Sequence, residues 1–292
     1  MTAYKIGTGT VDDVTGPLVL VGETVHKLSD VLGSNAPATL EEVMANWTAM
    51  DAQIEAALES VTVAGVSADD VTFATPIGNP RKVICIGTNY HDHLQEMKVT
   101  TLPEFPYAFM RPQTCLAAHG ESIDLPAGSQ MIDWEAELGI VIGSRFGPGD
   151  SGSPLNAVAG YTVLNDVSAR DWIIDRPWVG IDWVMQKAWD KFQPTGPWIT
   201  PSRFVSDPMA LDIELTVNGV TKQKSNTSQL IFGLHEILTH LTGIMTLEPG
   251  DIIATGTPAG VGFGMKPQEF LKGGDHVAVT IEGLGTLENT FK

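Results

Sequence analysis

Two glutamates in the segment DWEAELGIVIG, residues 133–143, are the strongest signal for chemistry in this sequence. Successive side chains of a strand point to opposite faces, so Glu135 and Glu137, two residues apart, point the same way. Adjacent carboxylates repel each other and favour protonation, whereas a divalent cation between them removes the conflict. The alternative is a solvated acidic end of a strand, and this motif alone leaves both interpretations open.

A third acid, Asp166, ends another apolar run in the segment GYTVLNDVSARDW. Binding residues often lie at such positions, where a strand passes into a loop. Two glutamates and one aspartate would offer three hard oxygen ligands, which suit Mg²⁺, Mn²⁺ or Ca²⁺, whereas zinc would favour histidine or cysteine. We therefore expect a site for a hard divalent ion that keeps a coordination position open for substrate.

The segment GTNYHDHLQEM, residues 87–97, follows a strand-like run and offers a base. If a helix begins near Tyr90, His93 and Glu96 are three residues apart and share one of its faces. Such a pair can take a proton from water near neutral pH. His91 is a competing candidate on another face, and the alternative for the pair is an ion pair at the surface.

Cationic side chains are scarce in this chain, and three of them lie near these motifs: Arg111, Arg170 and Lys187. Near a metal site they could hold a carboxylate of the substrate, and arginine could do so with two parallel hydrogen bonds. The alternative for each is an ordinary salt-bridging side chain. The segment ATGTPAGVG, residues 254–262, adds Thr257 and backbone amides that could bind an oxyanion. Its alternative is a tight loop that needs glycine for backbone reasons.

The elements that would carry these residues fall into two parts. Residues 39–60 show apolar side chains at helical spacing behind a Thr39–Glu42 capping box, which predicts one amphipathic helix. A Pro/Gly-rich segment, ATPIGNPRK at residues 74–82, follows and marks a boundary. We therefore expect a small N-terminal α+β domain over residues 1–78, without a chemical motif, and a larger domain with all the motifs over residues 79–292.

Short β-branched and apolar runs dominate the larger part and predict strands at residues 83–86, 138–142, 161–164, 213–217, 252–254 and 277–281. Asn218–Gly219 predicts a tight hairpin turn, since both residues tolerate a positive φ, and residues 282–285 predict a second hairpin. Helical patterns are fewer, chiefly at residues 91–97 and 232–243. The pattern predicts an α+β domain built on antiparallel or mixed sheet. No glycine-rich motif for a nucleotide is visible.

The composition limits the partners. The chain has 292 residues, 43% of them hydrophobic, and a formal charge of −18 that would repel nucleic acid and anionic membranes. No apolar run reaches the roughly 18 residues of a membrane-spanning helix, and the first residues lack the pattern of a signal peptide. We expect a soluble, cytoplasmic protein. Cys85 and Cys115 fit no metal-binding spacing and are interpreted as buried free thiols.

Taken in order, the motifs resemble those of the fumarylacetoacetate hydrolase superfamily. The resemblance covers roughly residues 82–290. It rests on the segments GTNYHDH, PYAFMRP, DWEAELGIVIG, GYTVLNDVSARD, QKAWD, SNTSQLIF, LEPGDIIATGTPAGVG and GDHVAVTIEGLGTLEN. It implies a mixed β-sandwich or β-roll catalytic domain, usually in a homodimer, that holds Mg²⁺ or a similar ion.

The resemblance also implies roles for the residues named above. Glu135, Glu137 and Asp166 become the metal ligands. His93 with Glu96 becomes the pair that activates water, and Lys187 becomes a catalytic lysine near the metal. Four residues become substrate-binding: Tyr90, Arg111, Arg170 and Thr257.

Two positions depart from the pattern of the family. Arg111 stands where the family often has lysine. Ile173 stands where the family often has glutamine, which removes an amide that would contact a substrate oxygen. Five tryptophans near this region would either pack a core or dimer interface or line an acyl pocket more apolar than a fumaryl group needs: Trp172, Trp178, Trp183, Trp189 and Trp198.

Together these features predict a metal-dependent hydrolase that cleaves a C–C bond in a 2,4-diketo acid, an acylpyruvate or a related β-diketone. A decarboxylase or isomerase of a keto acid would use the same enolate chemistry without an attacking water. A non-catalytic binding protein, in which the acids and tryptophans serve structure or a partner, would show no dependence on a divalent metal.

Overall fold

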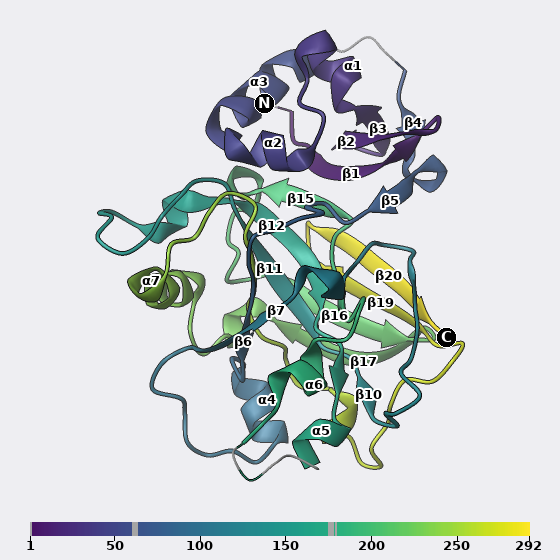
Figure 1. The fold of residues 1–292 in the computed structure, drawn as a ribbon, viewed down its shortest axis with the longest axis vertical. Helices are drawn as coiled ribbons and strands as arrows, with labels where there is room; N and C mark the ends of the chain where they lie inside the picture. Colours follow the sequence, from purple (N-terminus) through teal and green to yellow (C-terminus); the bar gives the residue numbers. More distant parts are fainter. Residues whose placement is uncertain (1, 60–63, 175–177, 179) are drawn as a thin grey trace.

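The computed structural model describes residues 2–59, 64–174, 178 and 180–292. Strands and short helices alternate along the chain, and the expected mixed α+β class is confirmed. The N-terminal part forms the upper lobe in Figure 1, and the strands and helices of the larger part lie below it. No helix within the described residues is both long and apolar enough to cross a membrane.

The larger sheet extends from the N-terminal lobe into the main body in the order β4-β3-β2-β1-β15-β12-β11-β18-β6-β7, with β5 paired to β1. Its centre is the antiparallel pair of β11 and β12, whose residues are all buried. The strands are β1 (Lys5–Val11), β2 (Val14–Val21), β3 (Thr24–Lys27), β4 (Val66–Ser67), β5 (Thr72–Ala74), β6 (Val83–Gly87), β7 (Tyr107–Arg111), β11 (Ala136–Ile142), β12 (Val158–Asn165), β15 (Trp198–Pro201) and β18 (Ile252–Ala254).

A second sheet has the order β17-β16-β19-β20-β9. Both predicted hairpins are confirmed, β16–β17 and β19–β20. Asn218 and Gly219 connect the first at φ values of 51° and 75°, in the left-handed region that these residues tolerate. The strands are β9 (Ser122–Ile123), β16 (Asp212–Val217), β17 (Val220–Asn226), β19 (His276–Ile281) and β20 (Gly285–Phe291).

The N-terminal helix differs from the prediction. Two helices, α2 (Leu40–Ala45) and α3 (Trp47–Leu58), replace the single helix expected over residues 39–60, and Asn46 breaks them apart at φ −135° and ψ 41°. Residue 60 lies outside the described residues. Thr39 caps α2 as predicted, because its side chain accepts from Glu42 N at 3.2 Å. The apolar spacing continues across the break because both helices pack into one core.

The larger sheet crosses the expected domain boundary. Strand β1 pairs antiparallel with β15, with Ile6 opposite Ile199. Strands from the two sides of the boundary therefore share backbone hydrogen bonds in one sheet. The division into residues 1–78 and 79–292 stays a prediction.

The main core is formed by side chains from both sheets and from helix α7 (Leu234–Ile244). Leu138 and Val163 of the larger sheet join Leu215 and Val279 of the second one in this core. A second core lies where α1 (Leu28–Leu32), α2 and α3 pack on the larger sheet. Cys85 and Cys115 are buried free thiols, as predicted.

Three short helices frame the region that carries the motifs, and they lie together at the lower end of the molecule in Figure 1. They are α4 (His91–Glu96), α5 (Asp171–Ile174) and α6 (Trp183–Lys187). Two short ribbons complete the fold: β10 (Ile132–Asp133) with β13 (Ser168–Ala169), and β8 (Leu116–Ala117) with β14 (Gln193–Pro194).

Candidate metal centre and active site

Three carboxylates converge where β11 begins and β12 ends. The antiparallel register pairs Ala136 with Asn165, which brings Glu135, directly before β11, and Glu137, within it, beside Asp166, directly after β12. A backbone hydrogen bond of 2.8 Å from Asp166 N to Glu135 O joins the two segments. One oxygen of each carboxylate lies within 4.8 Å of the others, and all three residues are buried. The structure thus brings together the three acids that the sequence singled out.

Two cationic side chains hold Glu135. Lys187 Nζ lies 2.9 Å from Glu135 Oε2 and 2.9 Å from Asp166 Oδ2. Arg170 Nη2 donates to Glu135 Oε1 at 2.6 Å. Burial alone would raise the pKa of Glu135, but the positive charges of Lys187 and Arg170 lower it to about 2. Glu135 is therefore ionised at neutral pH.

Glu137 is held without a cation. Gly256 N donates to Glu137 Oε2 at 2.8 Å, and within the described chain no lysine or arginine pairs with this carboxylate. Burial and the nearby charges of Asp166 and Glu135 raise the pKa of Glu137 well above its ordinary value. The ionised form of Glu137 thus has no cationic side chain paired with it among the described residues, and Lys187 offsets its charge only in part.

The donor set fits a hard divalent cation. It consists of three carboxylates and, in the described part of the chain, includes no cysteine or histidine. Oxygen ligands of this kind suit Mg²⁺, Mn²⁺ and Ca²⁺, and a bound cation would stabilise the ionised form of Glu137. The residues therefore support a divalent metal at this site.

Arg111 lies behind Asp166, away from the cavity that the carboxylates line. The guanidinium is buried, and its Nη2 donates to Asp166 Oδ1 and, at 2.8 Å, to Val167 O. Its Nη1 donates to Phe192 O at 3.0 Å. In this position Arg111 orients Asp166, and its expected contact with substrate stays a prediction.

His93 and Glu96 lie one turn apart on α4, as predicted. His93 Nδ1 is 3.2 Å from Glu96 Oε2, and Gly260 N donates to Glu96 Oε1 at 2.9 Å. Glu96 is therefore fixed on one side and orients the imidazole on the other, which leaves His93 Nε2 for a ligand. The competing residue, His91, is exposed.

A cavity of about 220 Å³ joins these groups. Its polar lining comes from Thr88, His93, Glu135, Glu137, Asp166, Arg170, Gln186, Lys187 and Thr257. Apolar side chains supply much of the rest: Met97, Val99, Phe109, Ile173, Ile181 and Trp183. The cavity thus combines the candidate base with the acidic cluster and an apolar wall.

Thr257 and Tyr90 were both expected to bind substrate, and the structure places them differently. Thr257 lines the cavity, and its Oγ1 accepts from Gln223 Nε2 at 2.9 Å, so the hydroxyl proton is free to donate. Tyr90 is buried outside the cavity lining, and its hydroxyl has no partner within the described residues.

Gly256, at φ 100°, precedes Thr257, and a Cβ there would lie 2.8 Å from Asn89 Cβ. The loop therefore also needs glycine for backbone reasons.

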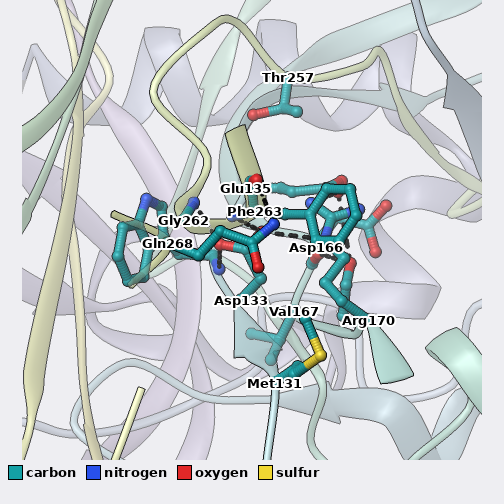
Figure 2. Close-up of polar contacts among 12 residues, drawn as sticks. Met131, Asp133, Glu135, Asp166, Val167, Arg170, Thr257, Gly262, Phe263 and Gln268 are labelled. Carbon is teal, nitrogen blue, oxygen red and sulfur yellow. Dashed lines mark hydrogen bonds and ion pairs between the residues drawn. The ribbon is translucent and has the colours of Figure 1, made fainter. Parts of the chain in front are cut away.

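Asp133 is a site residue that the sequence analysis did not single out. It is buried and accepts from Gly262 N at 2.7 Å, Phe263 N at 3.0 Å and Arg170 Nε at 2.9 Å (Figure 2). Asp133 thereby holds Arg170 against Glu135. The strand alternation that pairs Glu135 with Glu137 extends to Asp133, two residues earlier, and could have identified it.

Gln186 is the second such residue. It lies on α6 next to Lys187, is buried, and lines the cavity. No feature of the local sequence distinguishes it from a surface glutamine.

The tryptophans mostly support the core interpretation. Trp183 lines the cavity and stacks on Phe109, with ring centroids 4.6 Å apart and planes 13° apart. Trp178 is 96% exposed. The remaining three pack against hydrophobic cores: Trp172, Trp189 and Trp198. Only Trp183, within the described residues, meets the expectation of an apolar wall.

The chain belongs to the fumarylacetoacetate hydrolase family of enzymes. The sequence model described as fumarylacetoacetate (FAA) hydrolase C-terminal matches residues 82–292. The relatives below carry the names of hydrolases and of a tautomerase, so membership supports metal-dependent chemistry of this type without selecting one reaction.

Three relatives illustrate the similarity. The oxaloacetate tautomerase FAHD2A, mitochondrial, of Bos taurus is 44% identical over 220 residues, which cover 75% of this chain and 69% of that protein. The fumarylacetoacetate hydrolase of Exiguobacterium antarcticum is 34% identical, with a TM-score of 0.84 and coverage of 99% of both chains. The maleylpyruvate hydrolase of Sphingobium sp. SYK-6, in complex with manganese(II) and pyruvate, is 29% identical, with a TM-score of 0.78 and coverage of 98% of both chains.

Proposed function

We propose that this chain hydrolyses a carbon–carbon bond in a small 2,4-diketo acid, an acylpyruvate or a related β-diketone. The observation that carries the proposal is the single cavity that brings the three carboxylates together with His93, which Glu96 orients. Its volume of about 220 Å³ is below the range of sites for drug-sized ligands and suits a substrate of a few carbons.

Glu135, Glu137 and Asp166 would hold the metal, and their oxygens suit Mg²⁺, Mn²⁺ or Ca²⁺. When bound, such an ion draws electron density from the oxygens of a keto acid and stabilises the enolate charge that C–C cleavage releases. The relative crystallised with manganese(II) and pyruvate supports both a divalent ion and a keto acid as ligands of this site.

His93 would act as the base. Because Glu96 occupies its Nδ1, the imidazole would take a proton at Nε2 from a water molecule that attacks the distal carbonyl carbon. The C–C bond then breaks, and the proton returns to the enolate carbon of the leaving keto acid. The water oxygen ends in the carboxylic acid that is released, and the other product is pyruvate or an equivalent acid.

Thr257 and Lys187 would stabilise the oxyanion of the attacked carbonyl. The hydroxyl proton of Thr257 is free to donate, since Gln223 already donates to the Thr257 oxygen. One well-placed donor to such an oxyanion lowers the activation free energy by roughly 3 kcal/mol. Arg170, which also lines the cavity, would contact the carboxylate of the substrate.

Keto–enol tautomerisation of a 2-keto acid is the second candidate. The relative that is 44% identical carries the name of an oxaloacetate tautomerase and favours it. His93 would then take the proton from carbon instead of water. A decarboxylase or isomerase of a keto acid would likewise need no attacking water.

Turnover in water enriched in heavy oxygen distinguishes these reactions. We expect acylpyruvates, incubated with the protein and Mg²⁺ or Mn²⁺, to release a carboxylic acid that carries one labelled oxygen. Rapid loss of the enol form without a cleaved product would reject hydrolysis in favour of the tautomerase. Absence of turnover and of any heat on metal titration would favour a binding protein.

The expected homodimer and cytoplasmic location also remain proposals. Sedimentation velocity tests whether the protein is a homodimer.

A further inference from the structure

We propose that the amide of Gln186 binds an uncharged oxygen, a carbonyl or a hydroxyl, at the end of the substrate remote from its carboxylate. This inference rests on the proposed function, because it places the keto acid end of the substrate at the carboxylate cluster. It narrows the substrate class to 2-keto acids that carry a second, neutral oxygen rather than a second carboxylate.

Gln186 lies on a helix that contributes both polar and apolar side chains to the cavity. Helix α6 begins after Asp182, whose side chain caps it, and Trp183, Gln186 and Lys187 of this helix all line the cavity. Lys187 reaches the carboxylates, whereas Trp183, one turn before Gln186, stacks on Phe109. A ligand that extends from the carboxylates toward the apolar wall would therefore pass the helix that carries Gln186.

The amide of Gln186 is buried and incompletely paired. The residue is 1% exposed, and its Oε1 has no hydrogen-bond partner in the part of the chain that the structure describes. Gln223, a buried glutamine of the same site, shows the usual case: its Oε1 accepts from Ala136 N at 2.8 Å and its Nε2 donates to Thr257 Oγ1 at 2.9 Å. Since an unpaired buried polar group costs free energy, the amide of Gln186 is available to a ligand in the cavity.

The charges of the lining favour a neutral partner for this amide. The lysine and arginine side chains that line the cavity, within the described residues, are Arg170 and Lys187, and both lie against Glu135, at the end of the cavity where the carboxylate of the keto acid would bind. A second carboxylate near the apolar wall would lose water without gaining a cation, which is costly. A carbonyl can accept from the amide nitrogen and a hydroxyl can donate to the amide oxygen, without a charge on either.

Calorimetric titration of the Mn²⁺-loaded protein tests the proposal. The three ligands are 2-oxopentanoate, 4-hydroxy-2-oxopentanoate and 2-oxopentanedioate, none of which is a β-diketone that the protein could hydrolyse. We expect the hydroxyl ligand to bind about tenfold more tightly than 2-oxopentanoate, which is the effect of about one hydrogen bond. The dicarboxylate should bind no more tightly than 2-oxopentanoate. Gln186→Met keeps the length of the side chain without the amide, so it should lose the tenfold preference and keep its affinity for 2-oxopentanoate. Gln95→Met, at an exposed position on α4, is the matched control and should retain the preference.

The affinities of the unmodified protein for the three ligands test the proposal even if Gln186→Met fails to fold. Equal affinities for 2-oxopentanoate and its 4-hydroxy derivative would overturn the proposal, as would tighter binding of the dicarboxylate. If none of the three ligands binds in the presence of Mn²⁺, the keto acid site itself is wrong, and the proposed function falls together with this inference. Binding of all three with equal affinity rejects the role of Gln186 alone.

Discussion

Replacing Glu137 with glutamine should stabilise the metal-free protein and abolish its metal binding. The oxygens of the three carboxylates lie within 4.8 Å of one another. Two unit charges at that separation repel by roughly 3 kcal/mol at an effective dielectric constant of about 20. Glu137 faces two such charges, from Glu135 and Asp166, and Lys187 offsets part of their effect. We therefore expect the free energy of unfolding of metal-free Glu137→Gln to rise by up to about 3 kcal/mol.

The pH dependence of this gain has a definite sign. The pKa of Glu137 is higher in the folded than in the unfolded chain, so the folded protein holds an extra proton between the two values. Stability therefore falls as pH rises through that window, and the penalty is complete above the folded pKa. The gain from Glu137→Gln should be smallest at the ordinary glutamate pKa of 4.5 and should grow as pH rises.

Urea unfolding of chelator-treated protein over a pH series measures this gain, and repetition with Mn²⁺ measures the loss of metal binding. The glutamine can still accept the hydrogen bond from Gly256 N, so the substitution removes mainly the charge. Glu104→Gln, at an exposed position, is the control and should change neither quantity. A metal-free Glu137→Gln that is less stable than the unmodified protein at high pH would refute the electrostatic reasoning. Undiminished stabilisation of the variant by Mn²⁺ would remove Glu137 from the metal ligands.

Three further outcomes follow from the same contacts. Asp133→Asn should loosen Arg170 from Glu135 and weaken metal affinity by roughly 10-fold, because residues that hold metal ligands in place typically contribute that much. Calorimetry measures the affinity, and an unchanged value would contradict the positioning role of Asp133. His93→Ala should reduce kcat by about 10²- to 10⁴-fold while the metal affinity stays the same, and full activity would exclude this histidine as the base. Metal binding should release protons at pH values below the raised pKa of Glu137, because Glu137 must ionise to bind. Calorimetry in buffers of different ionisation enthalpy measures the release, and its persistence in Glu137→Gln would assign it to another group.

The acidic cluster could be predicted because its signal is local. Glu135 and Glu137 stand two residues apart at the start of a wholly apolar run, which strand geometry alone converts into two carboxylates on one face. The convergence of Asp166 is different, because it depends on the antiparallel pairing of β11 with β12. No periodicity within either strand specifies that partner, and the expectation came from the resemblance to a family.

Two features escaped prediction because their causes are not local. The break at Asn46 is hidden because α2 and α3 bury one continuous apolar stripe, so the spacing that predicts a helix continues across it. Gln186 stands on a helix of five residues and resembles any polar surface residue in the sequence. Its burial arises only when α6 packs beside the acidic cluster, which involves segments far apart along the chain.

The site contains two kinds of buried polar group, and the difference between them indicates what the fold provides and what a ligand must provide. Glu135 and Asp166 are each held by two cationic side chains, and Gln223 has partners for both ends of its amide. These groups are satisfied without a ligand, so they fix the geometry before anything binds. Glu137 has no cationic partner, and the oxygen of the Gln186 amide has no partner at all within the described chain. Since burying such groups costs free energy, a ligand that satisfies them recovers that cost on binding. An ion should therefore gain most from Glu137 and the substrate from Gln186, although both side chains lie among neighbours that contribute mainly to position.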